Sequence, residues 1–262
     1  MLGEELILLH EQSGLAPPFA SRHPGLTPAQ GYAAARMLHE HRLARGWKPL
    51  GRKIGFTNRT LWERYGVHEP MWGTVYDRTF IRAEGNRATV PLEGLVQPRI
   101  EPEIAVKLKS VPRSSDVAEL LRCIEWIAHA VEIVQCHFTD WKFTIADCCA
   151  DNGLHGRLIV GTPVPVGEVP GVVEKLPKVE AKLFKGDALK DRGVGANVLG
   201  SPLLSLGYFV DLLRKQPEAE QLRAGEIVTT GVLTDAHPVT PGETWHTEIS
   251  GLPLKGLTIT FR

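Results

Sequence analysis

The amino-acid sequence predicts an α+β fold in which a helical N-terminal portion packs on a strand-rich body. Residues 27–46 carry the periodic apolar pattern of an amphipathic helix. From about residue 80 onward, short runs rich in β-branched residues recur between turn residues, which is typical of strands. No internal repeat or low-complexity linker divides the 262 residues. We therefore expect a single domain over residues 1–262, with residues 1–75 mostly helical and residues 76–262 forming the strand-rich body.

The N-terminal portion contains one well-marked helix. Thr27 is a good N-cap, Pro28 suits the first helical position, and Gly46 provides the stop. Residues 49–56 then form a short apolar run broken by glycines. Residues 58–67 predict one or two helical turns, and residues 69–79 predict a loop lined with aromatic side chains.

The body alternates predicted strands with three helical patterns. The helices are expected at residues 115–130 and 201–216, each capped by a serine, and around residues 144–152. The predicted strands cover residues 99–108, 130–138, 156–164, 179–186, 226–234, 244–252 and 256–262.

Composition excludes several classes of partner. Lys and Arg together number 30, as do Asp and Glu, so no large field exists to hold nucleic acid or an anionic membrane. No apolar stretch approaches a membrane-spanning length, and the first residues lack the lysines of a signal peptide. The four cysteines form no C-x-x-C, and a vicinal pair such as Cys148-Cys149 rarely bridges without strain. We expect reduced thiols, a cytoplasmic protein and a small-molecule partner.

Two glutamates stand one residue apart in the apolar run of residues 99–108. Residues i and i+2 of a strand share a face, so Glu101 and Glu103 are neighbours. A solvated strand face would explain this pair, but Glu132 also lies in an apolar run, where an unpaired carboxylate is costly. Two unit charges 4 Å apart repel by about 4 kcal/mol at an effective dielectric near 20. If the three converge, either a hard cation such as Mg²⁺ or Mn²⁺ lies between them or one glutamate is protonated.

Lys53 is the second chemical candidate. It lies between Gly51 and Gly55, which permit close approach of a ligand or another segment. A surface lysine is the plain alternative to a proton carrier or an anion clamp. Further acid–base candidates are Asp77, Asp147 and Asp151, although single aspartates are more often caps or turn residues. His155 could face a cleft, and aromatic residues after Lys53 (Trp62, Tyr65, Trp72, Tyr76) could form core or cover a small ligand.

Several standard signatures are missing from the sequence. It has no G-x-G-x-x-G fingerprint, no Walker loop, no G-x-S-x-G elbow and no H-E-x-x-H. Nucleotide chemistry and serine hydrolysis therefore lose most of their support.

Taken in order, many segments resemble the 2-keto-4-pentenoate hydratase and 4-oxalocrotonate decarboxylase family within the fumarylacetoacetate hydrolase superfamily. The resemblance runs through nearly the whole chain. The segments are GRKIGFTN, YGVHEPMWGTVYD, PRIEPEIAVKL, VEIVQCHFTDWKFTIADCCADNG, VLGSPLLSLGYFVDLL and TTGVLTDAHPVTPGETW.

The resemblance implies a fold and a site. The fold would be a mixed β-sheet roll of the fumarylacetoacetate hydrolase C-terminal-domain type, forming one catalytic domain. Mg²⁺, or Mn²⁺, would be held by Glu101, Glu103 and Glu132, with Lys53 and Asp77 as catalytic residues. Residues expected beside the substrate are Asn152, His155 and Thr230. Family members commonly read Asp-Asn-Ala-Ser where this chain has Asp151-Asn152-Gly153-Leu154, so a hydroxyl expected near the substrate is missing.

The resemblance also implies a metal-dependent lyase of aromatic meta-cleavage catabolism that acts on 2-hydroxy-2,4-dienoate or 2-oxo-enoate acids. Hydration of 2-hydroxypenta-2,4-dienoate to 4-hydroxy-2-oxopentanoate is the favoured reaction. The alternatives are decarboxylation of 4-oxalocrotonate (2-oxohex-3-enedioate), C–C hydrolysis of an acylpyruvate, and a non-catalytic partner subunit. We also expect a homo-oligomer and consider a complex with a pathway hydratase or decarboxylase.

Overall fold

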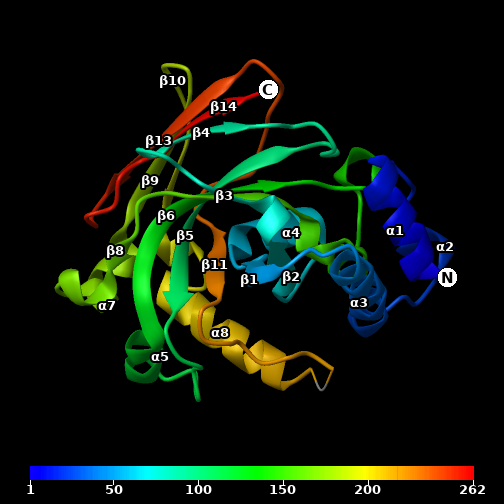
Figure 1. Cartoon of the computed structure of the whole chain (residues 1–262), viewed down its shortest axis with the longest axis horizontal. Coiled ribbons are helices and arrows are strands. Elements are labelled where there is room, and N and C mark those ends of the chain that lie inside the picture. The colour runs from blue at the N-terminus through cyan, green and yellow to red at the C-terminus, as the bar shows by residue number, and fades with distance from the viewer. Residues whose placement is uncertain (217) are drawn as a thin grey trace.

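A computed structural model describes residues 1–216 and 218–262, and its centre is a sheet of nine strands. Seven strands follow the order β2-β1-β11-β5-β6-β7-β3, while β12 pairs with β5 and β8 pairs with β6 (Figure 1). Their bounds are β1 (Pro49–Gly55), β2 (Met71–Tyr76), β3 (Phe80–Arg82), β5 (Arg99–Leu108), β6 (Ile124–Val134), β7 (His155–Val160), β8 (Val164–Pro165), β11 (Ile227–Val232) and β12 (His237–Pro238).

A second sheet of five strands has the order β10-β9-β13-β14-β4. Its strands are β4 (Arg87–Val90), β9 (Glu180–Lys185), β10 (Ala188–Val194), β13 (Thr244–Ser250) and β14 (Thr258–Phe261). A buried cluster joins the two sheets, with Val131 and Ile133 of β6 in the same core as Trp245 of β13 and Ile259 of β14. Glu132, on the other face of β6, is also fully buried.

Three N-terminal helices lie together at one side of the molecule: α1 (Leu2–Gln12), α2 (Phe19–Arg22) and α3 (Pro28–Ala44) (Figure 1). The predicted cap is present, since the Thr27 side chain accepts a hydrogen bond from the backbone N–H of Gln30 and the Gln30 side chain accepts one from the backbone N–H of Thr27. The helices bury Leu6, Phe19 and Leu38 against α6 (Ile145–Ala150) and Phe138.

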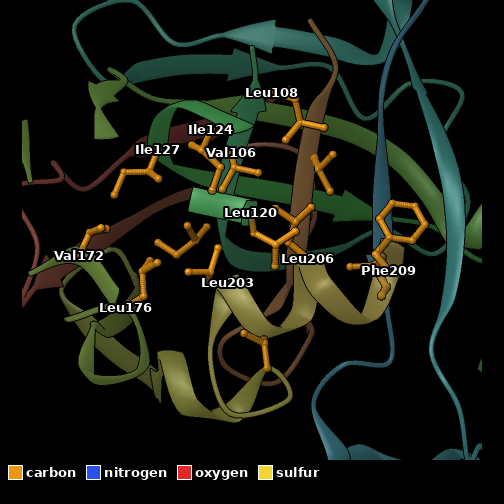
Figure 2. Close-up of a cluster of buried hydrophobic side chains, with 14 of the residues drawn as sticks. Val106, Leu108, Leu120, Ile124, Ile127, Val172, Leu176, Leu203, Leu206 and Phe209 are labelled. Atoms are coloured by element: carbon orange, nitrogen blue, oxygen red, sulfur yellow. The ribbon is translucent and has the colours of Figure 1, made fainter. Parts of the chain in front are cut away.

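The largest core lies between the main sheet and α8 (Pro202–Arg214), which α5 (Val117–Cys123) flanks. Figure 2 shows Leu203, Leu206 and Phe209 of α8 directed toward this core, which includes Val106 and Leu108 of β5. Burial of each such side chain contributes about 1.5 to 3 kcal/mol. This core fixes β5, which carries two of the three predicted metal ligands.

The remaining elements are short. They are α4 (Trp62–Tyr65), α7 (Val172–Lys175) and the 3₁₀ helices η1 (Arg59–Leu61), η2 (Asp77–Thr79), η3 (Thr139–Trp141), η4 (Asn152–Leu154), η5 (Val166–Glu168), η6 (Leu176–Lys178) and η7 (Gly195–Asn197). Within the described parts of the chain, no helix combines the length and apolar character that crossing a membrane requires.

The α+β prediction is confirmed, but some boundaries differ. The helix predicted over residues 115–130 ends at Cys123, because residues 124–134 pair with β5 along nearly their whole length. The mostly helical portion of residues 1–75 also contains β1 and β2, which belong to the main sheet. Gly51 allows β1 to pair with β11 in this sheet. A Cβ at this position would lie 1.8 Å from the carbonyl oxygen of Ile227 in β11, so only glycine allows the pairing.

Candidate metal centre

The register of β5 and β6 brings the three glutamates together. Glu101 lies directly opposite Glu132 in the antiparallel pair, and Glu103 shares the face of Glu101. One carboxylate oxygen of each glutamate lies within 4.8 Å of the others. The same face continues as Ala105, Ala128 and Ala130, whose small side chains leave the carboxylates room.

Lys53 reaches the cluster from β1, two strands away from β5. Its Nζ lies 3.3 Å from Oε2 of Glu132, and its side chain is only 3% exposed. A Cβ at Gly55 would lie 3.1 Å from this Nζ, so the glycine leaves space beside the ammonium group. Lys53 is therefore desolvated, which excludes the alternative of a surface lysine.

The glutamates are held in an unfavourable electrostatic state. Burial, opposed by Lys53 and reinforced by the two other glutamates, raises the pKa of Glu101 to about 8. Burial and Glu132 raise the pKa of Glu103 well above its usual value. Burial lowers the pKa of Lys53, but the carboxylates of Glu132, Glu101 and Glu103 more than offset it and raise that pKa.

The donor set fits a hard divalent cation. Three carboxylates and one ammonium leave two negative charges in a buried site when all are ionised. Oε2 of Glu132 is buried and accepts no hydrogen bond, whereas Oε2 of Glu103 accepts one from the backbone of Gly231, at 2.9 Å. An all-oxygen set of this charge suits Mg²⁺ or Mn²⁺.

His155 contacts the Glu132 carboxylate and fixes its orientation. Its Nδ1 lies 2.8 Å from Oε1 of Glu132, and its Nε2 lies 2.8 Å from Oγ1 of Thr79. Its side chain is fully buried. Such partners fix the orientation of a ligating carboxylate. The sequence predicted a substrate contact for His155, but the structure makes it an orienting group for Glu132.

Three other predicted site residues lie outside the pocket that Lys53, Glu101 and Glu103 line. The Asn152 side chain bonds both the N–H and the carbonyl of Thr74 in β2. The Thr230 hydroxyl donates to the carbonyl of Ile104. The Asp77 carboxylate accepts from the N–H groups of Lys48 and Arg78. Gly73 is the partner of Lys53 in β2, and at about 3.3 Å per residue Asp77 lies roughly 13 Å further along.

A pocket opens above the centre, and aromatic side chains form much of its wall. Lys53, Glu101 and Glu103 line one part, while Phe56, Tyr65, Trp141, Phe143 and Leu154 line another. Its volume is about 40 Å³. Of the four aromatic residues that the sequence offered as core or as cover for a ligand, Tyr65 lines this pocket. The other three pack elsewhere: Trp62 donates to the Phe56 carbonyl, Trp72 stacks on Tyr32, and Tyr76 contacts His39.

A second buried cluster joins α1 to the body. Nε2 of His10 and Nδ1 of His137 each lie 2.8 Å from Oδ1 of Asp151. Burial lowers the pKa of His10 to about 3, and its Nδ1 lies 3.0 Å from Nη2 of Arg42. The Asp151 carboxylate in turn favours the charged form of the Arg42 guanidinium. The sequence suggested Asp151 as an acid–base group but not its histidine partners, because their approach depends on how α1 docks.

The fold and the site together define an α+β roll with a buried carboxylate centre suited to a hard divalent cation. Searches with family models give no match. A 4-oxalocrotonate decarboxylase of Pseudomonas sp. is 31% identical over 242 residues, covering 92% of this chain and 90% of that protein. A 2-keto-4-pentenoate hydratase of Paraburkholderia xenovorans is 29% identical over 241 residues, covering 90% and 85%. The chain therefore belongs to the 4-oxalocrotonate decarboxylase and 2-keto-4-pentenoate hydratase family.

Solved structures agree with this assignment. The 4-oxalocrotonate decarboxylase of Pseudomonas putida G7, complexed with magnesium and adipate, superposes with a TM-score of 0.90 at 26% identity, over 100% of this chain and 96% of that one. A fumarylpyruvate hydrolase of Pseudomonas aeruginosa, in complex with Mn²⁺ and pyruvate, has a TM-score of 0.60 at 13% identity, over 80% of this chain and 88% of that one. The second match shows a shared fold, and the predicted fumarylacetoacetate hydrolase type of roll is confirmed.

Proposed function

We propose that this protein is a Mg²⁺-dependent lyase that acts on 2-hydroxy-2,4-dienoate or 2-oxo-enoate acids, and that it hydrates 2-hydroxypenta-2,4-dienoate to 4-hydroxy-2-oxopentanoate. One observation carries the proposal: Glu101, Glu103 and Glu132 converge beside Lys53, and Lys53, Glu101 and Glu103 line a pocket. Membership of the family supports the reaction class.

The three glutamates would hold the cation, with His155 orienting Glu132. When bound, a divalent cation here would polarise the 2-oxo group of the substrate and stabilise enolate charge. Mn²⁺ satisfies the same donor set as Mg²⁺.

Lys53 supplies the proton or the anion clamp. The carboxylates of Glu132, Glu101 and Glu103 raise the pKa of Lys53 in the metal-free site, which favours its protonated form there. Its Nζ, on the pocket wall, can deliver a proton to the dienol or hold the substrate carboxylate. The ion pair with Glu132 keeps the ammonium beside the cation site.

Decarboxylation of 2-oxohex-3-enedioate is the second candidate. It is favoured by the TM-score of 0.90 with a decarboxylase that binds magnesium and adipate. The test offers 2-hydroxypenta-2,4-dienoate and 2-oxohex-3-enedioate with Mg²⁺ and follows products by NMR. Formation of 4-hydroxy-2-oxopentanoate supports the hydratase, and CO₂ release supports the decarboxylase. Pyruvate from an acylpyruvate would instead indicate a hydrolase, and no turnover of any substrate would indicate a silent partner subunit.

Location and assembly are part of the same proposal. The four cysteines are free and buried, which fits a reducing cytoplasm. We also propose a homo-oligomer, to be measured by light scattering after size-exclusion chromatography, and the same measurement with a pathway hydratase or decarboxylase tests a mixed complex. The C-terminal strand β14 is paired on both sides by β13 and β4, so neither of its edges is free to pair with a second chain.

A further inference from the structure

We infer that the site selects a substrate with one carboxylate and an apolar tail, and that the tail lies against the wall formed by Phe56, Tyr65, Trp141, Phe143 and Leu154. This inference rests on the proposed function, because the metal and Lys53 are taken to bind the 2-oxo acid end. It adds the chemistry of the opposite end of the substrate, which decides between acids of equal length.

The charges of the pocket are segregated. Lys53 is the one cation among the described residues that line it, and its Nζ is already 3.3 Å from Oε2 of Glu132. The wall away from the glutamates is built from aromatic rings, with Tyr65 and Phe143 stacked at 5.4 Å between centroids. A second carboxylate placed there would lose its hydration without gaining a cationic partner.

Arg99 contacts two residues of this wall. Its Nη1 donates to the Tyr65 hydroxyl at 3.1 Å, and its guanidinium lies 3.9 Å from the centroid of Trp141. Both partners are pocket residues, whereas Arg99 itself does not line the pocket. The guanidinium therefore holds the two rings in place by a hydrogen bond and a cation–π contact.

Leu154 adds an apolar group from a strained turn. Asn152, Gly153 and Leu154 have φ of 48°, 64° and 61°, and a leucine rarely occupies the left-handed region. The turn is fixed by two backbone bonds, from Leu154 N–H to the carbonyl of Asp151 and from Gln135 N–H to that of Leu154. Strain of this kind persists where the surroundings over-determine it, and here it directs a branched apolar side chain to the pocket.

The test compares two unreactive 2-oxo acids of equal length, 2-oxohexanoate and 2-oxohexanedioate, by calorimetric titration in Mg²⁺. The inference predicts that 2-oxohexanoate binds about tenfold more tightly or better, because the dicarboxylate must bury a charge without a partner. Equal or tighter binding of 2-oxohexanedioate overturns it. Arg99→Gln is expected to leave the order of the two affinities unchanged, and a selective loss of dicarboxylate binding in this variant would identify Arg99 as a clamp and overturn the inference.

Leu154→Arg places a cation in the wall and is expected to reverse the preference, while Leu154→Met, the matched apolar control, should keep it. The wild-type comparison decides the matter even if Leu154→Arg fails to fold. The titrations are repeated in EDTA to separate this inference from the proposed function. A preference for 2-oxohexanoate that does not require Mg²⁺ would support the inference about the apolar wall and contradict the role of the metal in the proposed function. Tighter, Mg²⁺-dependent binding of the dicarboxylate would support the role of the metal and overturn the inference about the apolar wall. If neither acid binds, both the proposed function and the inference are contradicted.

Discussion

Glu103→Gln tests the metal centre through stability alone, with no assumption about the substrate. The ligand oxygens lie within 4.8 Å of one another, so each ionised pair repels by at least about 3.5 kcal/mol at an effective dielectric near 20. The substitution removes Glu103 from two such pairs, while the amide oxygen can still accept the hydrogen bond from Gly231. Protonation already relieves part of this repulsion, because the pKa of Glu101 is raised to about 8. We expect the Mg²⁺-free variant to be more stable than wild type by about 1 to 3 kcal/mol.

Mg²⁺ should reverse this order. At 100 times its dissociation constant, Mg²⁺ stabilises the wild type by about 2.7 kcal/mol, which raises Tm by roughly 5 to 10 °C for a chain of this size. Glu103→Gln should show almost no shift at the same concentration. The assay is thermal unfolding in EDTA and in Mg²⁺, with the exposed Glu125→Gln of β6 as control. A variant that is destabilised in EDTA, or that keeps the full Mg²⁺ shift, would refute the reasoning.

Three further predictions follow from the same site and its surroundings. Lys53→Met should lower turnover by about 10²-fold to 10⁴-fold. It should retain or tighten Mg²⁺ binding, because it removes a positive charge 3.3 Å from Glu132. Lys107→Met, at a half-exposed position, is the control, and a parallel loss of Mg²⁺ binding and turnover would contradict the catalytic role of Lys53. Because the pKa of Glu101 is raised to about 8 and ligands must be deprotonated, Mg²⁺ affinity measured by titration should fall about tenfold per unit as pH drops from 8 to 6, and a flat profile would contradict this. Burial lowers the pKa of His129 from 6.5 to about 4, so its neutral form stabilises the fold above pH 6.5 and this stability is lost as pH falls toward 4; the loss should be about 2 kcal/mol at pH 5. Urea unfolding at pH 7 and pH 5 should show a smaller difference for His129→Gln than for wild type, and equal differences would exclude this contribution.

Local patterns predicted the parts of the fold that depend on one strand or one helix. The strand expected at residues 99–108 coincides with β5, because a short apolar run is a local signal, and Glu101 and Glu103 share one of its faces. The α3 helix follows from Thr27 and its capping partner. The helix expected over residues 115–130 was too long, because pairing with β5 overrides helical periodicity from Ile124 onward. Helix α1 and strands β4 and β10 were not predicted.

Local sequence patterns also predicted some of the site residues, but not those whose positions depend on contacts between distant segments. The three glutamates and Lys53 were predictable, because charged residues inside apolar runs need a partner wherever the strands pair. The positions of Asp77, Asn152, His155 and Thr230 depend on contacts between distant segments, such as His155 with Glu132 and Asn152 with Thr74. Spacing along the chain carries no signal for those contacts. The His10–His137–Asp151 cluster was missed for the same reason.

The central claim is that one divalent cation lies among Glu101, Glu103 and Glu132 and receives a 2-oxo acid there. The most direct measurement is a crystal structure with Mn²⁺ and 2-oxohexanoate, using the anomalous signal of manganese to place the ion. The account predicts a single peak about 2.2 Å from an oxygen of each glutamate, with the 2-oxo acid end of the ligand bound to it. A peak at His10, His137 and Asp151 instead, or glutamates that turn away from the ion, would contradict it.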